Sequence, residues 1–335
     1  MRSSRRSLSA VLALTATFTW SSRATSQQQA QGFALDRLYP SAPGGGWIVM
    51  DTLDRTEGIG GVVGLTAWYA HDPLIVRASD GAQRLAVVSD EALASFAFAV
   101  TYERWKLYLN LDMPLDVEGK SGSVGGYEFA APNAGQAFTS TGVNPSTAPD
   151  ALTDARVGVD IRLLGEARSA FRLGAGAQLL VSTPNTPGSE YLTDGALRAM
   201  GRLLFAGDID RFSYAGQVGV HIRPRDDSPA PGGPQGSELL FGVAAGPKFL
   251  LGEKEQMALI AGPEVFGETA FRSFFGSSAT GVEGLLSVRL EGTRDDGPQL
   301  RVKIGAGTGL DQRFGTPEWR MVFGVELFDH TRSAF

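Results

Sequence analysis

Two stretches, Ala155-Arg156-Val157-Gly158-Val159-Asp160-Ile161-Arg162-Leu163 and Leu300-Arg301-Val302-Lys303-Ile304-Gly305-Ala306, alternate between apolar and polar or small residues. Successive side chains of a β-strand point to opposite faces of the sheet, so the apolar residues share one face and the charged residues share the other. The same pattern recurs from Asp154 to Phe328. A strand of a soluble β-sandwich also has one dry and one wet face, so further features must separate the two folds.

The first feature is an export signal. Arg2, Arg5 and Arg6 form a basic start, and an apolar run from Leu8 to Trp20 follows, which is too short to span a membrane as a helix. Small residues at Ala24-Thr25-Ser26 offer a cleavage site before Gln27. We therefore predict that residues 1–26 are a secretory signal peptide and that residues 27–335 form one β-barrel domain.

Composition narrows the classes of partner. The formal net charge of -6 becomes -10 after removal of residues 1–26, because they contain four arginines and no acid. This acidic balance argues against a nucleic-acid partner. The chain has no cysteine, which excludes disulfides and a lipid anchor on cysteine. A mean hydropathy of -0.04 is compatible with a membrane barrel, because half of each barrel strand faces the lumen.

The alternating segments predict an all-β fold, an antiparallel transmembrane barrel of the outer membrane with fourteen strands. If 33–39 is not a strand, we expect twelve strands, with residues 33–53 rearranged. The predicted strands are 33–39, 46–53, 60–70, 92–102, 106–116, 154–164, 169–182, 195–206, 211–223, 238–251, 256–267, 281–291, 298–310 and 317–328.

Short and long connections alternate along the chain. Short ones such as 103–105 and 165–168 are rich in charge and glycine, whereas 117–153 and 224–237 are long and rich in Gly, Pro and small polar residues. Outer-membrane barrels have short periplasmic turns and long outer loops. An even strand count therefore predicts that both termini are periplasmic. Residues 71–91 contain a hairpin that we expect to project from the barrel rim.

In the predicted strands from residue 60 onward, the charged side chains lie at alternate positions, and we call such a set of alternate positions one parity of the strand. An Arg or Lys at mid-depth on the lipid side would cost about 2–4 kcal/mol, so we assign this parity to the lumen. The candidate lumen-lining residues are Arg156, Asp160, Arg162, Arg172, Arg198, Arg202, Gln217, Lys248, Glu264, Glu283, Arg289, Arg301, Lys303, Arg320 and Glu326. The opposite parity carries the lipid-facing residues, with Tyr102, Tyr214 and Trp319 near strand ends as an aromatic girdle.

Two interpretations of these charges remain open. They could line a pore and set its selectivity, or they could form a salt-bridged polar core that fills a closed lumen. Glycines on the same parity, at 174, 176, 219, 242, 246, 305 and 307, favour an open lumen. Pro247 and Pro263 predict either a lateral gap in the wall or a pair of tolerated bulges.

Catalytic and cofactor motifs are not found in the sequence. The histidines are His71, His221 and His330, and no zinc, calcium, nucleotide or nucleophile-elbow motif is present. We therefore expect no enzyme activity and no cofactor or metal. His221 is the one histidine that could be placed in a hydrolase-like site on the barrel.

Several stretches carry a resemblance to a known family. Residues 33–54 (FALDRLYPSAPGGGWIVMDTLD), 71–76 (HDPLIV), 155–166 (ARVGVDIRLLGE), 171–184 (FRLGAGAQLLVSTP) and 261–269 (AGPEVFGET) resemble the N-terminal β-barrel of large OmpA-family outer-membrane proteins. The resemblance implies a structural barrel, which in that group is often followed by a peptidoglycan-binding domain. This sequence ends seven residues after the last predicted strand, so we do not expect peptidoglycan binding.

Two functions follow from the sequence. The first is a passive, porin-like channel for small solutes or apolar compounds. The second is a closed-lumen structural or surface-interaction barrel that works through its long outer loops, 117–153 above all. Only residues 27–32 precede the first predicted strand, so we expect any plug to be a loop folded inward. The expected partners are outer-membrane lipid, the barrel-assembly machinery and the solute or apolar ligand.

Overall fold

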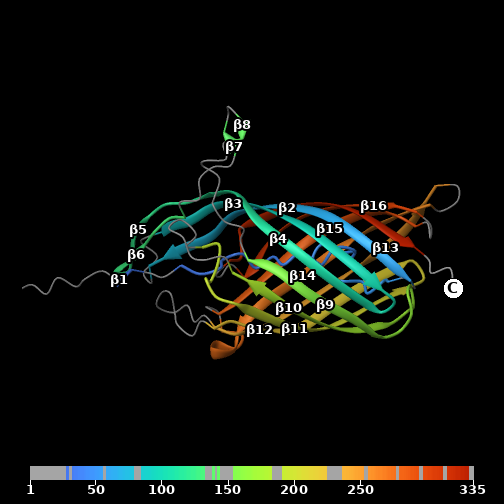
Figure 1. Cartoon of the computed structure of the whole chain (residues 1–335). Coiled ribbons are helices and arrows are strands. Elements are labelled where there is room, and N and C mark those ends of the chain that lie inside the picture. The colour runs from blue at the N-terminus through green and yellow to red at the C-terminus, as the bar shows by residue number, and fades with distance from the viewer. Residues whose placement is uncertain are drawn as a thin grey trace, which may run out of the picture.

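Twelve strands close into one antiparallel barrel in a computed structural model of the chain (Figure 1). The strand order around the barrel follows the chain, and β17 pairs with β2 to close the wall. The structure describes residues 28–29, 32–55, 58–78, 84–132, 138–139, 142–143, 154–182, 191–224, 236–252, 256–276, 279–293, 297–311 and 315–331. The predicted signal peptide lies outside these residues. Among them, no helix is long and apolar enough to cross a membrane.

The barrel strands are β2 (Ile59–Arg77), β3 (Arg84–Tyr102), β4 (Trp105–Glu118), β9 (Ala155–Leu164), β10 (Arg172–Val181), β11 (Arg198–Ile209), β12 (Phe212–Ile222), β13 (Glu238–Leu251), β14 (Met257–Ala270), β15 (Thr280–Gly292), β16 (Gln299–Asp311) and β17 (Trp319–Thr331). Short strands at one rim are β1 (Gln28–Gln29), β5 (Gly122–Val124), β6 (Tyr127–Phe129), β7 (Phe138–Thr139) and β8 (Gly142–Val143), and η1 (Phe271–Ser273) follows β14.

The two rims differ in the length of their connections. At one rim β3 and β4 are joined by residues 103–104, and β11 and β12 by residues 210–211. At the other rim the connection from β4 to β9 spans 119–154 and contains β5 to β8 (Figure 1). We call these the short-turn rim and the long-connection rim. The expected sorting of the connections by length is confirmed.

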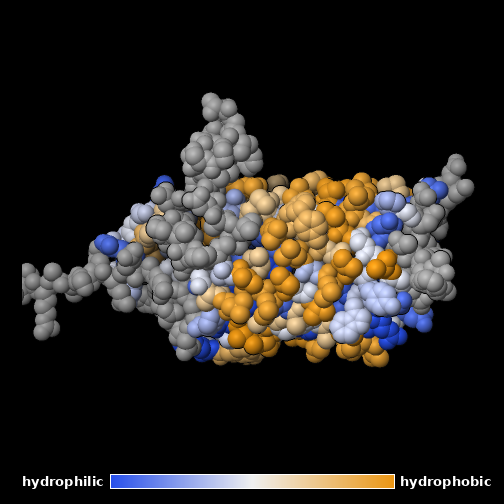
Figure 2. All heavy atoms as spheres, viewed as in Figure 1, coloured by the Kyte–Doolittle hydropathy of each residue, from blue (hydrophilic) through white to orange (hydrophobic). Residues whose placement is uncertain are grey.

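Figure 2 shows an apolar band on the visible face of the barrel, and each of the twelve wall strands exposes at least one large apolar side chain. Leu107, Leu286 and Met321 are 61%, 65% and 57% exposed although they are large and apolar. A soluble protein rarely leaves so wide an apolar surface in water, whereas lipid tails solvate it. The fold is therefore that of an outer-membrane β-barrel, as the alternation predicts.

The predicted strands 33–39 and 46–53 are not part of the wall. Residues 33–55, which we call the luminal segment, run through the interior of the barrel without joining its ladder. An isolated bridge between Gly46 and Asp51 closes a turn within the segment itself. The prediction of fourteen strands is therefore wrong, and the alternative of twelve, with these residues rearranged, is correct. The expectation that any plug is a folded-in loop is also wrong, because the chain before β2 fills the lumen.

The sequence of the luminal segment explains why it leaves the sheet. Pro40 and Pro43 each lack the N–H that a ladder needs, and Gly44-Gly45-Gly46 includes two residues with positive φ. Residues 47–50 are four apolar residues in a row, and all four are buried. A strand in the wall exposes alternate residues to lipid, whereas a segment inside the lumen is buried on every side.

Because the luminal segment crosses the barrel from one rim to the other, it also decides at which rim each end of the described chain lies. The luminal segment starts beside Tyr191, in the connection between β10 and β11 at the long-connection rim. It ends beside Arg104 at the short-turn rim, where β2 begins and β17 ends. Twelve wall strands and one luminal crossing make an odd number of crossings, so these ends lie at opposite rims. The prediction that both lie on the same side is wrong for the described residues.

The predicted rim hairpin is an extension of β2 and β3. The two strands remain paired as far as Arg77 and Arg84, with register shifts near Leu74. Most barrel strands end earlier, so this pair projects beyond the long-connection rim (Figure 1).

Pro247 and Pro263 produce neither a gap nor a bulge. Pairing between β13 and β14 stops after Ala244 and resumes at Lys248 in the same register. The strands stay close between these points, because a Cβ on Gly246 would lie 2.0 Å from the carbonyl oxygen of Ala261. The two prolines therefore interrupt ladder hydrogen bonds while the wall remains closed.

Candidate functional site

Side chains of the wall hold the first part of the luminal segment at the long-connection rim. Asp36 accepts a hydrogen bond from Trp68 Nε1 at 2.8 Å and pairs with Arg320 at 2.9 Å. Asp194, in the connection after β10, accepts a hydrogen bond from Ala34 N at 2.8 Å. Burial by itself raises the pKa of Asp194. Arg223 donates two hydrogen bonds to the Asp194 carboxylate and lowers this pKa more than burial raises it, so the pKa lies below the usual range of an aspartate. The segment thus enters the lumen through charge-assisted bonds, which are the strong class of hydrogen bond.

Glu264 on β14 holds the middle of the segment. Its carboxylate accepts hydrogen bonds from the backbone N–H groups of Ile48, Val49 and Met50 at 2.8, 2.9 and 3.4 Å. The side chain of Glu264 is fully buried. One wall carboxylate therefore satisfies three backbone donors of a turn that has no sheet partner.

Cations of the wall hold the end of the segment near the short-turn rim. Lys106 pairs with Asp51, and Arg172 donates to the carbonyl oxygen of Thr52 at 2.8 Å. Arg162 donates to the carbonyl oxygens of Leu53 and Arg55 at 3.2 and 2.7 Å. Wall guanidinium groups thus satisfy carbonyl groups that would otherwise be buried without a partner.

Three luminal glycines make room for side chains of the segment. A Cβ at Gly174 would lie 2.9 Å from Leu53, one at Gly242 2.3 Å from Met50, and one at Gly305 2.3 Å from Ile48. Because the segment occupies the space that they leave, these glycines do not produce the open lumen that the sequence favours. They are the positions of the wall against which apolar side chains of the luminal segment pack.

We expect Gly305→Val to weaken docking of the luminal segment. The added methyl groups occupy the position of the Ile48 side chain, and overpacking of this kind costs about 1–3 kcal/mol. Trypsin cleavage after Arg55, which is 3% exposed, should then become about 5 to 150 times faster. Gly201→Val is the matched control, since a Cβ there meets nothing within 4 Å. Equal cleavage rates in the two variants would contradict the seating of Ile48.

All fifteen candidate lumen residues occupy inward positions of the wall. Twelve are buried and three, Arg202, Gln217 and Lys248, are half-buried. Most of their charges are paired. Arg301 bonds Glu326 at 2.7 Å, Lys303 bonds Glu326 at 2.5 Å, and Arg202 bonds Asp160 at 3.1 Å. In this state the charges form a salt-bridged polar interior around the segment, as the second interpretation describes. Contact of these residues with a solute stays a prediction.

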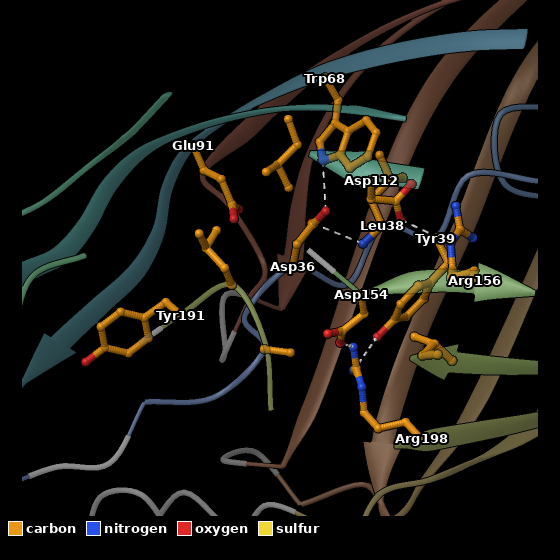
Figure 3. A pocket seen from close by; sticks show the side chains of 14 residues that line it. Asp36, Leu38, Tyr39, Trp68, Glu91, Asp112, Asp154, Arg156, Tyr191 and Arg198 are labelled. Carbon is orange, nitrogen blue, oxygen red and sulfur yellow. Dashed lines mark hydrogen bonds and ion pairs between the residues drawn. The ribbon is translucent and has the colours of Figure 1, made fainter. Parts of the chain in front are cut away.

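A pocket opens beside the luminal segment near the long-connection rim, with a volume of about 420 Å³ that includes its open side (Figure 3). Aromatic and aliphatic side chains alternate with carboxylates and two guanidinium groups. The lining residues are Ala34, Asp36, Leu38, Tyr39, Trp68, Glu91, Leu93, Asp112, Asp154, Arg156, Leu180, Tyr191, Leu192 and Arg198.

Glu91 is the least compensated acid of this pocket. Arg156 pairs with Asp112 at 3.1 Å, and Arg198 pairs with Asp154. Glu91 is 1% exposed, and its Oε2 has no hydrogen-bond partner within the described part of the chain. Figure 3 shows its carboxyl group directed toward Asp36. A buried carboxyl beside another acid is an electrostatic cost to the folded barrel.

We expect Glu91→Gln to raise the free energy of unfolding by about 1–3 kcal/mol, because it removes this uncompensated charge and keeps the shape. Urea titration of the barrel in detergent micelles would measure the change. Glu166→Gln, at an exposed turn position, should stay within about 0.5 kcal/mol of the parent. A lower stability for Glu91→Gln would show that the carboxylate is bound to a cation or to water.

The sequence interpretation missed the residues that the luminal segment brings to the site. The sequence pattern places Asp36, Arg37 and Asp51 in predicted wall strands and does not assign their charges to the lumen. The signal for them was the loss of alternation at residues 47–50, together with Gly44-Gly45-Gly46.

No protein-family model matches the chain. No curated protein matches its sequence. Among solved structures, an outer membrane channel from Pseudomonas putida F1 is 12% identical with a TM-score of 0.49, over 82% of this chain and 96% of that one. The NanC porin is 5% identical with a TM-score of 0.44, over 80% and 100%. The CymD monoaromatic hydrocarbon channel is 10% identical with a TM-score of 0.42, over 90% and 100%. The fold and the filled interior define an outer-membrane β-barrel with a segment docked in its lumen.

Proposed function

We propose that the protein is a gated channel of the outer membrane, through which small solutes or apolar compounds pass when the luminal segment moves. The observation that carries the proposal is that no residue of this segment forms a β-ladder pair with a wall strand. Side chains hold it, and its backbone bonds include internal ones such as Ser41 N to Ile48 O at 2.8 Å. The segment can leave its seat without breaking the ladder of the barrel.

We also propose which rim of the barrel faces the periplasm. Short turns are periplasmic in outer-membrane barrels, so the long-connection rim faces outside and the pocket near that rim meets a solute first. Outer-membrane lipid covers the apolar band, and the barrel-assembly machinery inserts the chain. The role is transport without catalysis. Membership of the OmpA family is a further proposal, based on the sequence resemblance alone.

The second candidate function is a closed structural barrel. The observation that favours it is the dense pairing of buried charges around the segment, from Asp36 at one rim to Arg55 at the other. Breaking a buried pair by losing one partner costs about 3–5 kcal/mol, so a segment held by several such pairs could stay in place permanently.

Planar-bilayer recording separates the two functions. We expect the refolded 27–335 chain to show rare, brief current steps, and a variant without residues 27–55 to conduct steadily. Arg301→Glu in the shortened chain should shift selectivity toward cations, because Arg301 lies on the inner face of β16. A folded, heat-modifiable shortened barrel that carries no current would refute the channel and support the closed barrel.

A further inference from the structure

A buried histidine lies between two glutamates at the long-connection end of the lumen. His221 on β12 is fully buried, and Glu238 on β13 and Glu268 on β14 are 5% and 7% exposed. A ligand atom from each of these residues lies within 4.8 Å of those of the other two. They come from three adjacent strands, so the wall itself fixes their positions.

The polar atoms of this cluster are not satisfied by hydrogen bonds. Within the described residues, neither ring nitrogen of His221 has a hydrogen-bond partner, and neither do the two carboxylate oxygens of Glu268. Buried polar atoms normally have one, so the unsatisfied Nδ1 of His221, which faces the two glutamates, indicates a missing ligand there. A water molecule or a metal ion could contact Nδ1 of His221 and an oxygen of each glutamate at once.

Distances favour the metal ion. His221 Nδ1 lies 3.5 Å from Glu238 Oε2 and 3.7 Å from Glu268 Oε2. These separations are long for an N–H···O hydrogen bond. Around a tetrahedral zinc ion with bonds of about 2.0–2.2 Å, neighbouring donors are about 3.3–3.6 Å apart. The donor set of one imidazole and two carboxylates suits zinc and its neighbours in the first transition row.

Arg37 of the luminal segment competes for the same oxygens. Its NH1 lies 3.3 Å from Glu238 Oε2 and 3.5 Å from Glu268 Oε2. Its NH2 lies 3.1 Å from Glu238 Oε1. A dication and this guanidinium group cannot both occupy the space between the carboxylates, because like charges at that distance repel strongly.

The charge balance also favours the exchange. Four carboxylates meet here, from Glu238, Glu268, Asp194 and Asp154, and three guanidinium groups face them, from Arg37, Arg223 and Arg198. With neutral His221 the cluster carries one excess negative charge. Replacing Arg37 by a dication leaves it neutral. A second pocket, lined in part by Arg37, Gln217 and Glu268, lies beside the cluster.

We propose that His221, Glu238 and Glu268 form a binding site for a divalent transition-metal ion, which enters in exchange for Arg37 of the luminal segment. Metal binding is measured directly, so it stands or falls independently of the channel function. If the channel function also holds, the exchange releases one anchor of the segment and makes the metal a regulator of the gate.

The test uses Co²⁺ as the probe on the refolded 27–335 chain. His71 and His330 are replaced by Gln in every sample, because His71 lies beside Asp72 and Glu318 in a second, partly exposed cluster. His221 is then the sole histidine, and the visible absorption of bound Co²⁺ reports its coordination. We expect His221→Gln to weaken binding at least 100-fold and Arg37→Met to strengthen it about 10-fold.

Two results would overturn the proposal. One is Co²⁺ affinity that is unchanged by His221→Gln. The other is a Co²⁺ affinity that stays the same or falls in Arg37→Met. That result would mean that a proton or a water molecule, and not a metal ion, occupies the space between His221, Glu238 and Glu268. Heat-modifiability of each variant on gels establishes that the barrel is folded, so a loss of binding is not confused with a loss of structure.

Discussion

Replacing Glu264 with Ala should convert the barrel from a mostly closed to a mostly conducting state. The variant removes the only described acceptor of three backbone N–H groups, at residues 48–50. A hydrogen bond to a charged group contributes about 1.5–3 kcal/mol, and the three bonds share one carboxylate, so we take about 3 kcal/mol for the set. That is a change of about 100-fold in the ratio of docked to released segment. Open probability in planar bilayers measures it.

The control for this prediction is another luminal carboxylate that does not touch the segment. Glu291 on β15 bonds Arg301 at 2.6 Å and lies 3.7 Å from Arg289. Glu291→Gln should leave the open probability close to that of the parent, and Glu264→Gln, which keeps one acceptor oxygen, should fall between Glu264→Ala and the parent. An unchanged current in Glu264→Ala, with a folded barrel, would place the closure elsewhere in the lumen.

The sequence predicts the wall of this barrel because every wall strand follows one rule: apolar residues that face lipid alternate with mostly polar or small residues that face the lumen. Val157 and Arg156 differ in burial for the same reason as Val302 and Arg301, since one faces lipid and the other the lumen. The rule depends only on neighbours in the chain, so alternation alone locates the strands. The lipid cost of a misplaced arginine keeps the pattern strict.

The luminal segment obeys no such rule. Its residues are buried by contacts with strands that are distant in the chain, such as Glu264 for Ile48 and Arg320 for Asp36. Phe33 to Tyr39 resembles a strand, and the loss of alternation at residues 47–50, together with Gly44-Gly45-Gly46, indicates otherwise. The cluster around His221 was missed for the same reason. Its three members are far apart in the chain, and barrel closure brings them together.

Arg320→Met should lower the free energy of unfolding more than any other single change considered for this barrel. Arg320 is 1% exposed, bonds Glu283 at 2.9 and 3.1 Å, and pairs with Asp36 at 2.9 Å. Methionine fills much of the same volume, so the cost is electrostatic. Two carboxylates lose their buried counter-ion, and breaking a buried pair in this way costs about 3–5 kcal/mol. Urea titration in detergent micelles measures the loss.

Two further variants show whether the loss comes from uncompensated charge. Arg84→Met removes the same group from an exposed ion pair with Asp72 at 2.9 Å, and should cost less than about 1 kcal/mol because water screens that pair. The double variant Arg320→Met, Glu283→Gln should recover at least half of the loss, since one of the two stranded carboxylates is then neutral. If Arg320→Met costs no more than Arg84→Met, water reaches Glu283 in the folded state. The lumen would then be wet at this depth, and the luminal segment would not seal it.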